Sequence, residues 1–573
     1  MKKDKNSERK NLFQQIFYVS QSYVKENWPS LIVFLCTFIV ATAFAFVRVA
    51  TMASVSSYSI DSYEVGQVAD KTIIAGKSLP ATTENPISIT KGERIIRKGF
   101  MITEDEYAKL RVLAESPVYI DYRAFANSLL YLMLIGALYF FLYGETCLGY
   151  KIKLKEQITG SVFFLVTYAF AIFSTKLSSF PSNMMIAVLT PGIFFTYLIA
   201  ILFSQRNAVY FSFLISFSVL NVCESPLLPF FYLLSSTLAA SRIVKKISRR
   251  IDMLVASFVQ CLLNIVFLII IKIIFNSVAA DLFFLLPGVA FNGFISAILC
   301  LGFITPIELL LNTASVFRLM DLNDLSTPTL KKLQLNATGT YSHSVMVAHL
   351  AEAACSDIGA NGLLARVGAY YHDIGKMDNP EYFTENQTGS NIHNEIKPSL
   401  SVSIIRSHVK NGLEKARALR LPDRVLDIIA EHHGNQVISY FYNSAKEKDP
   451  NVNPADYSYN GNPPTSKESA VVMLADTVEA ACRSFDNPSV SRIDKFTQEL
   501  MDAKVNARQL DNCNLTFKEL NIIHSAFVQI LAGYYHSRIK YPEQKDPDTG
   551  KSEKNPSAEK EEKEEGDKEK ENA

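Results

Sequence analysis

The sequence is poor in charge, and its first half has no histidine. Charged residues make up 20% of the 573 residues, compared with about 25% in a typical soluble domain, and 49% are hydrophobic. The 57 basic and 56 acidic side chains give a net charge of +1, so the total charge indicates neither a nucleic-acid partner nor an acidic one. All nine histidines lie at or after His343. These shortages exclude a purely soluble protein and indicate an apolar, membrane-embedded half joined to a polar half that carries the histidines.

Cysteine is also scarce. The chain has eight cysteines, and no two of them form a Cys-x-x-Cys pair. A zinc ribbon and a dithiol redox pair are therefore excluded. The segment 49–125 has no cysteine, so no disulfide can stabilise it in an oxidising compartment.

Long apolar runs dominate residues 29–305. A bilayer core requires about 20 apolar residues per helix, because lipid cannot form hydrogen bonds with an exposed backbone. The candidate spans are 29–48, 126–145, 160–176, 184–204, 208–222, 226–241, 253–275 and 282–305. The two short spans within 208–241 could be two tilted helices or one re-entrant hairpin. The first span is expected to be an uncleaved anchor, because its apolar run is longer than a signal-peptide core and no clear cleavage site follows it.

Basic residues indicate the orientation of these spans. Lys and Arg near span ends are retained in the cytoplasm. They gather in the N-terminal segment 1–28, in the loop 148–159 and after residue 241, whereas the alternate loops have almost none. With eight spans, this pattern predicts that both chain ends are cytoplasmic and that the lipid bilayer is a partner of the protein.

The rest of the chain divides by composition. A small extracytoplasmic module is expected at 49–125, with a strand pair and then a helix within 87–116; it could bind a ligand or serve only as a spacer. A seven-helix membrane block at 126–305 and a linker at 306–338 would precede a cytoplasmic domain at 339–540. The tail 541–573 has seven Lys and twelve acidic residues, a composition typical of disorder.

The cytoplasmic domain is predicted to be an all-α bundle, so that the whole chain is all-α. Strand patterns are scarce in it, and apolar residues recur at helical spacing. The predicted helices are 343–357, 361–374, 399–419, 422–433, 466–484, 491–506 and 516–536.

Five histidines and two aspartates carry the chemistry of this bundle: His343, His372, Asp373, His408, His432, His433 and Asp476. Imidazole and carboxylate suit divalent iron, manganese, cobalt or zinc, and so many nitrogen ligands disfavour magnesium and calcium. Neighbouring helix residues diverge by about 100°, so each adjacent pair can serve one cleft only where a helix end faces two targets. Two metal ions would supply those targets. The other histidines (His349, His393, His524 and His536) are expected to be structural or at the surface.

The motifs GTYSHS, HDIGK, EHHG and LAD occur together between Gly339 and Arg483. This stretch resembles the seven-transmembrane receptor HD family, and in particular the PgpH-type cyclic di-AMP phosphodiesterases of the HD superfamily. The resemblance implies a multi-pass protein of a bacterial-type inner or plasma membrane with a cytoplasmic phosphohydrolase domain. The sequence departs from the family in its short extracytoplasmic segment, in Met377-Asp378-Asn379-Pro380 after HDIGK, and in NIHNEIKPSL before His408.

The resemblance also implies a site with two metal ions, iron or manganese. His343, His372, Asp373 and Asp476 would bind one ion, and His408, His432 and His433 the other, with Asp373 bridging. Cations lower the pKa of bound water, and the resulting hydroxide would open the ring of cyclic di-AMP to linear pApA.

Two basic residues are candidates for contacts with the substrate. Lys376 is the candidate phosphate contact and, with Asp373, a catalytic residue, unless it is a surface lysine. Arg483 is a second candidate contact, unless it forms a structural salt bridge. Tyr341 and Tyr371 could stack on a base, although packing is the simpler role. Two metal ions, the two aspartates and Lys376 would give the site a charge of about +3.

Two other functions stay open. The first is hydrolysis of another cyclic dinucleotide, cyclic di-GMP, although the HD-GYP enzymes continue their HH pair with a GYP signature and here Asn435-Gln436-Val437-Ile438 follows EHHG. The second is a membrane receptor whose HD domain only binds a nucleotide, which the complete ligand set argues against. No nucleic-acid polymer is expected as a partner, and the sequence is compatible with a homo-oligomer.

Overall fold

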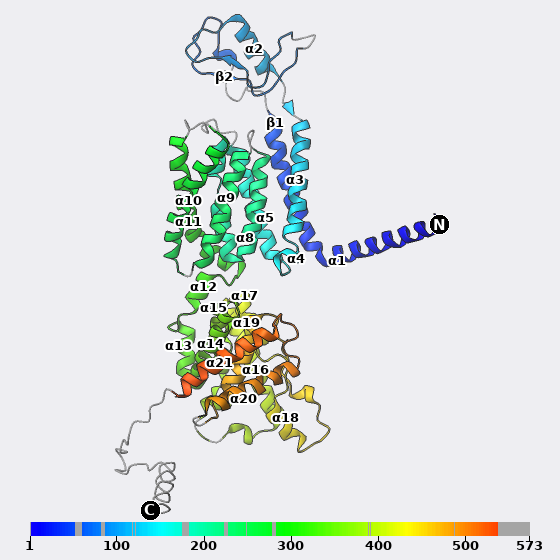
Figure 1. Ribbon diagram of the computed structural model, residues 1–573, viewed down its shortest axis with the longest axis vertical. Coiled ribbons are helices and arrows are strands. Elements are labelled where there is room, and N and C mark those ends of the chain that lie inside the picture. Colours follow the sequence, from blue (N-terminus) through cyan, green and yellow to red (C-terminus); the bar gives the residue numbers. More distant parts are fainter. Residues whose placement is uncertain are drawn as a thin grey trace, which may run out of the picture. The chain divides into compact units, whose positions relative to one another are not determined.

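The computed structural model describes twelve stretches of the chain (Figure 1), which are 2–51, 60–81, 86–116, 119–120, 122–174, 183–222, 227–247, 249–277, 282–387, 389, 391–485 and 488–536. The chain forms two units, Met1–Asp321 and Leu322–Ala573. Both are mainly helical, as predicted. The predicted tail at 541–573 and residues 223–226, between the two short predicted spans, lie outside the described residues.

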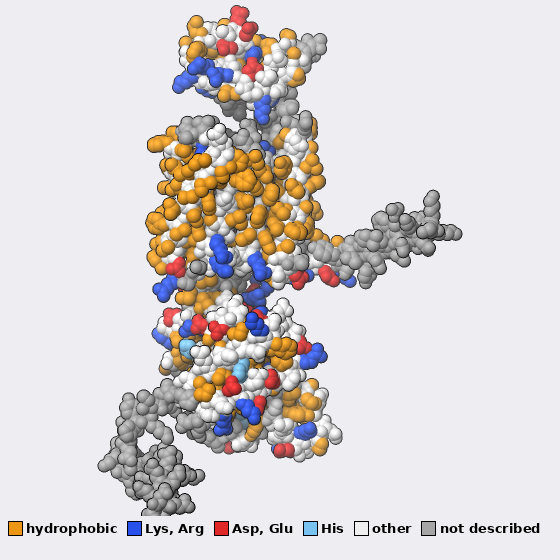
Figure 2. Space-filling view, viewed as in Figure 1, with side chains coloured by type: hydrophobic (Ala, Val, Ile, Leu, Met, Phe, Trp, Pro, Cys, Tyr) orange, Lys and Arg blue, Asp and Glu red, His pale blue; other side chains and the backbone are white. Residues whose placement is uncertain are grey.

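The first unit contains the apolar helices. These are α1 (Lys2–Val49), α3 (Tyr122–Leu142), α5 (Leu154–Ser174), α6 (Asn183–Leu189), α7 (Gly192–Leu202), α8 (Gln205–Leu220), α9 (Leu227–Ile243), α10 (Asp252–Ile274) and α11 (Leu282–Leu311). Hydrophobic side chains cover the visible face of this helical block (Figure 2). Such a surface would be unstable in water and suits the interior of a bilayer.

Six segments of the described chain are long and apolar enough to cross a membrane, fewer than the eight spans that the sequence predicts. The two predicted spans that are not among the six correspond to α8 and α9, which are shorter, with 16 and 17 residues. The predicted span 184–204 is divided into α6 and α7 at Pro191, which has no N–H for a continuous helix. Helix α8 begins at Gln205 because the Ser204 side chain accepts a hydrogen bond from Asn207 N at 3.2 Å and caps the helix.

A small module with its own core lies between α1 and α3 in the chain. Strand β2 (Ile73–Ile74) pairs antiparallel with β3 (Arg94–Ile96), and α2 (Glu104–Glu115) follows. The helix begins where the sequence predicts, because Thr103 and Glu106 form a capping box. The strand partner lies outside the expected range 87–116. Within the described residues the core is formed by isoleucines and leucines of these elements, including Ile73, Ile96 and Leu110.

Short elements complete the first unit. They are β1 (Ala50–Thr51), which pairs with β4 (Tyr119–Ile120), η2 (Ile60–Ser62), α4 (Glu145–Leu148) and η3 (Val244–Lys246).

The second unit is a helical bundle. Its main helices are α13 (Pro328–Asn336), α14 (Thr338–Asp357), α15 (Gly362–Tyr371), α16 (Pro398–Ala418), α17 (Asp423–Glu431), α18 (Ser439–Lys446), α19 (Lys467–Cys482), α20 (Val490–Asn506) and α21 (Phe517–His536). Each of the seven predicted helices has a counterpart. Sequence reasoning missed α18. The segment 306–338, predicted as a linker with one connecting helix and a turn, contains two helices, α12 (Val316–Leu322) and α13.

Helix α19 is the central helix of this bundle. Every residue from Ser469 to Asp476 is buried, and the helix packs against α14, α15, α17 and α20. Burial of each large apolar side chain stabilises the fold by about 1.5–3 kcal/mol. The polar residue Asp476 is therefore held at a fixed position inside the bundle.

Candidate metal centre

The seven candidate ligands come from separate elements of the second unit and meet inside it. His343 lies on α14, His408 on α16 and Asp476 on α19. The two adjacent pairs lie where helices end: His372 and Asp373 directly follow α15, and His432 and His433 directly follow α17. The backbone changes direction at these ends, so both members of each pair can face the same centre. This is the arrangement that the sequence predicts for the pairs.

Asp373 lies at the middle of the cluster. Its Oδ2 is 3.1 Å from His372 Nε2 and 3.7 Å from His343 Nε2. Its Oδ1 is 3.4 Å from His408 Nε2 and 3.8 Å from His432 Nε2. Each carboxylate oxygen therefore faces a different pair of histidines, as a bridging ligand between two metal ions would.

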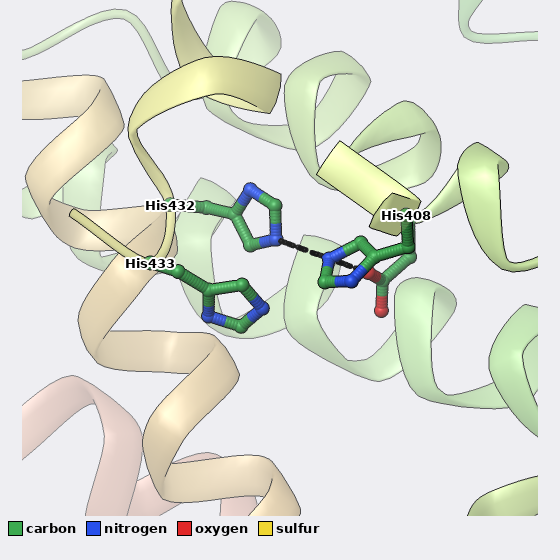
Figure 3. Close-up of side chains that lie close together, drawn as sticks. His408, His432 and His433 are labelled. Carbon is green, nitrogen blue, oxygen red and sulfur yellow. Dashed lines mark hydrogen bonds and ion pairs between the residues drawn. The ribbon is translucent and has the colours of Figure 1, made fainter. Parts of the chain in front are cut away.

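Two groups of side chains have ligand atoms within 4.8 Å of one another. The first contains His343, His372 and Asp373, and the second contains Asp373 with His408, His432 and His433. Figure 3 shows the rings of His408 and His432 directed toward each other, with their Nε2 atoms 3.3 Å apart. The two groups share only Asp373.

Asp476 approaches both groups. Its Oδ1 lies 3.0 Å from His343 Nε2, and its Oδ2 lies 3.6 Å from His433 Nδ1. The sequence analysis assigned Asp476 to the first ion alone. The structure brings it within reach of both groups, because α19 runs through the centre of the bundle.

Backbone carbonyls fix the tautomers of three histidines. The Nδ1 atoms of His372, His408 and His432 lie 2.6, 2.5 and 2.8 Å from the carbonyl oxygens of Ala369, Ile405 and Ile429. A carbonyl oxygen can only accept, so each Nδ1 carries the proton and each Nε2 presents a lone pair to the centre.

Two polar atoms at this centre are buried without a hydrogen-bond partner among the described residues. They are His372 Nε2 and Asp373 Oδ1. An unpaired buried polar atom is costly, and a bound cation would satisfy both atoms. The donor set therefore fits a divalent transition metal, with imidazole nitrogens as its main ligands.

Burial and neighbouring charges keep His408, His432 and Asp373 in ligand form. Burial lowers the pKa of His408 to about 4 and that of His432 to about 3, so both rings are neutral at pH 7. Burial alone would raise the pKa of Asp373, but His372 and Lys376 hold it well below its ordinary value. His343 differs: burial opposes its charged form, but hydrogen bonds to Asp476 and Glu479 raise its pKa to about 9.

Lys376 lies in the first turn after the HD pair, in η4 (Ile374–Asp378). Its Nζ is 2.7 Å from Asp373 Oδ2 and 2.9 Å from Glu385 Oε1, and its side chain is 12% exposed. It is therefore not a surface lysine. Glu385 was missed as a site residue, although it lies between Gly339 and Arg483, the stretch that carries the resemblance.

Arg483 forms the salt bridge that the sequence analysis weighed against a substrate contact. Its Nη2 is 2.5 Å from Glu479 Oε2 and 2.8 Å from His343 Nδ1. Glu479 also pairs with His343 Nδ1. Sequence reasoning missed Glu479, although its place three residues after Asp476 puts the two carboxylates on one face of α19.

The tyrosines and remaining histidines have other surroundings. Tyr371 is buried, and its hydroxyl lies 3.3 Å from the Leu322 carbonyl oxygen, so it packs. A tyrosine that sequence reasoning missed, Tyr459, stacks on His433 with ring centroids 4.2 Å apart. His393 is buried beside Phe441, outside the cluster. Three more residues lie outside the cluster: Tyr341 is half-buried, His349 is exposed, and His524 Nε2 lies 3.0 Å from the Asp494 carbonyl oxygen. The side chain of His536 is outside the described residues.

Two family models match the chain. Residues 124–315 match the model for a 7TM receptor with intracellular HD hydrolase, and residues 340–481 match the HD domain. The first region is therefore similar to the membrane part of such receptors, and the second is similar to HD domains. The second region contains all seven candidate ligands.

Curated relatives agree with these matches. The cyclic-di-AMP phosphodiesterase PgpH of Listeria monocytogenes is 33% identical over 473 residues, which cover 80% of this chain and 65% of that protein. The protein of the same name from Bacillus subtilis is 40% identical over 316 residues, which cover 54% of this chain and 44% of that protein. The chain thus spans about two thirds or less of the length of these relatives.

A solved structure of an HD domain is similar to part of the chain. The HD domain of L. monocytogenes phosphodiesterase PgpH, in complex with cyclic di-AMP, is 44% identical in sequence. The match covers 37% of this chain and 100% of that one, with a TM-score of 0.36.

Proposed function

We propose that this protein is a membrane-bound, metal-dependent phosphodiesterase that hydrolyses cyclic di-AMP to linear pApA. The observation that carries the proposal is the cluster around Asp373, where two groups of histidines face the two oxygens of one buried carboxylate. The names of the relatives support the substrate. The intact ligand set supports an enzyme over a receptor that only binds a nucleotide.

The residues of the cluster would form two metal sites. His343, His372, Asp373 and Asp476 would bind one divalent ion, and His408, His432 and His433 the other, with Asp373 bridging. Iron or manganese suits this mixture of imidazole and carboxylate ligands. Bound divalent cations would supply positive charge that polarises a phosphate oxygen and activates water for attack.

The basic side chains would guide the substrate. Lys376 would hold its ammonium beside the bridging carboxylate and contact a phosphate. Arg483 pairs with Glu479, but its side chain is 39% exposed and would contact the second phosphate from there. Glu385 and Glu479 add two negative charges that the sequence analysis did not count, and Arg483 adds a positive one. With two divalent ions the site would carry about +2 rather than +3, which still complements a substrate with two phosphates.

The membrane half would place this site in the cytoplasm. Helices α8 and α9, added to the six longer apolar segments, would give eight spans. The basic loops of the sequence would then keep both chain ends cytoplasmic in a bacterial-type inner or plasma membrane. The extracytoplasmic segment 49–125, the membrane block 126–305 and the HD domain 339–540 would follow one another in this order.

The test uses the full chain, purified in detergent and loaded with Fe²⁺ or Mn²⁺. Wild type should convert cyclic di-AMP to pApA, and Asp373→Ala should lower turnover by at least 1,000-fold, because each ion loses its shared ligand. Asp378→Ala is the matched control, since Asp378 lies five residues away and pairs with Lys415 at 2.6 Å, outside the cluster.

Two results would contradict the proposal. Metal-loaded wild type that hydrolyses no cyclic dinucleotide would favour the receptor function. Faster turnover of cyclic di-GMP than of cyclic di-AMP, assayed in parallel, would reassign the substrate.

A further inference from the structure

A cavity lies among the apolar helices α1, α3, α5, α7 and α8 of the first unit. It is partly open to its surroundings. Its walls are mostly apolar, with Phe38, Leu132, Phe164 and Ile199 among the residues that line it.

One part of the wall is polar. Glu156, Gln157 and Asn207 line the cavity together with the aromatic residues. Asn207 Nδ2 donates to Glu156 Oε2 at 3.1 Å, and Gln157 Nε2 donates to the Ser30 carbonyl oxygen at 2.8 Å. Both amide nitrogens are thereby occupied, and these bonds fix the two side chains in place.

The amide oxygens of the same two side chains are unpaired. Among the described residues, Gln157 Oε1 and Asn207 Oδ1 have no hydrogen-bond partner, although the two residues are only 4% and 2% exposed. A buried acceptor without a donor costs about 1–3 kcal/mol. Two such acceptors at one cavity indicate a ligand that donates hydrogen bonds there. The Glu156 carboxylate beside them disfavours an anionic group.

We propose that this cavity binds the hydrocarbon chain of a membrane amphiphile whose uncharged or cationic head donates hydrogen bonds to Gln157 Oε1 and Asn207 Oδ1. The apolar walls suit the chain, and the surrounding helices carry the apolar surface expected in a bilayer, where such molecules are concentrated. A hydroxyl and an ammonium group share the required chemistry, because both donate hydrogen bonds. A carboxylate head lacks a donor and meets Glu156.

A glycine in the cavity wall provides a selective variant. A Cβ atom built on Gly160 has no atom within 4 Å, so a larger side chain can extend there without a clash at its first carbon. Gly160→Leu should fill part of the space that the hydrocarbon chain would occupy. Gly302 on α11 has equally open surroundings and does not line the cavity, so Gly302→Leu is the matched control.

The experiment uses the full chain in phosphatidylcholine nanodiscs. Three photoactivatable probes share one C16 chain with a mid-chain diazirine and differ in their heads: monoacylglycerol, primary amine and carboxylate. Crosslinked peptides are identified by mass spectrometry. We expect the hydroxyl and ammonium probes to label peptides of the cavity wall at least 10-fold more than the carboxylate probe, since one hydrogen bond contributes about 1 kcal/mol and two act here. The amine probe labelling more strongly than the glycerol probe would assign the head to an ammonium that pairs with Glu156, and the reverse order would assign it to a hydroxyl.

The variants separate a specific site from a nonspecific gap. Gly160→Leu should lower the labelling at least 10-fold, whereas Gly302→Leu should retain it. Gln157→Leu removes one acceptor and should reduce the preference between heads about 5-fold; it decides the question if Gly160→Leu does not give a monodisperse protein. Equal labelling by all three probes, or equal labelling of both glycine variants, would overturn the proposal.

Discussion

Glu479 controls the tautomer of His343, which gives a prediction specific to one side chain. The Glu479 carboxylate accepts a hydrogen bond from His343 Nδ1, so the proton that a metal ion would displace from this ring is the one on Nε2, which faces Asp476. Arg483 Nη2 lies 2.8 Å from the same Nδ1 atom and 2.5 Å from Glu479 Oε2. The carboxylate therefore decides which group bonds to Nδ1.

Removing the carboxylate should reverse this arrangement. In Glu479→Ala the Arg483 guanidinium would donate to His343 Nδ1, which favours the tautomer with a proton on Nε2. That tautomer cannot bind a metal ion through Nε2. Loss of an outer-shell partner typically lowers metal affinity 10–100-fold, equal to about 1.4–2.7 kcal/mol, and we expect Glu479→Ala at the upper end. Glu479→Gln keeps an oxygen that accepts from Nδ1, so its loss should be about 10-fold.

The assay is a Mn²⁺ titration of the full chain by calorimetry. Glu352→Ala is the control, since Glu352 lies on α14 like His343 but pairs with Arg366 at 2.7 Å. Arg483→Ala added to Glu479→Ala should recover part of the affinity, because it removes the competing donor. Equal Mn²⁺ affinity of Glu479→Ala and Glu352→Ala, or no recovery in the double variant, would refute this reasoning.

Three further predictions concern the fold. A Cβ atom on Gly375 would lie 1.9 Å from the His408 carbonyl oxygen. Gly375→Ala should therefore lower the free energy of unfolding by about 3 kcal/mol or more, and the melting temperature with it. Gly533 has no neighbouring atom within 4 Å of a Cβ, so Gly533→Ala should be neutral or slightly stabilising. Burial lowers the pKa of Lys504 to about 8 from 10.5. The unfolded state therefore binds more protons between these pH values, and the free energy of unfolding should rise with pH across this window by up to about 3 kcal/mol. In Lys504→Met this rise should be absent when thermal unfolding is followed at each pH. Thr103→Ala removes a helix cap and should cost about 1 kcal/mol, visible as faster hydrogen exchange in the first turn of α2; unchanged exchange there would contradict the role of the cap.

Sequence reasoning predicted the helical bundle and the groups that meet in it, because both follow from local pattern. Apolar residues at helical spacing gave the helices, and the adjacent pairs His372-Asp373 and His432-His433 required helix ends facing a common centre. The structure has both pairs at such ends. The helix expected within 87–116 is likewise present as α2.

The missed residues depend on tertiary contacts. Glu385 contacts Lys376 only because the loop after η4 folds back over the HD pair. The spacing of apolar residues in the sequence does not indicate this path of the loop. Tyr459 stacks on His433 from an irregular segment before α19. The break at Pro191 and the shortness of α8 were also beyond a count of apolar residues, because composition alone does not fix where a helix ends.

The histidine carbonyl bonds have a consequence for the kinetics of metal uptake. His372, His408 and His432 each donate Nδ1–H to the carbonyl of the residue three positions earlier, within their own helix or its last turn. The backbone thus directs their Nε2 atoms to the centre before any ion arrives. His408 and His432, whose pKa values lie well below 7, need neither rotate nor lose a proton to bind it. The rate of metal binding at these two rings should therefore depend little on the buffer, because the nitrogen ligands are already oriented and deprotonated.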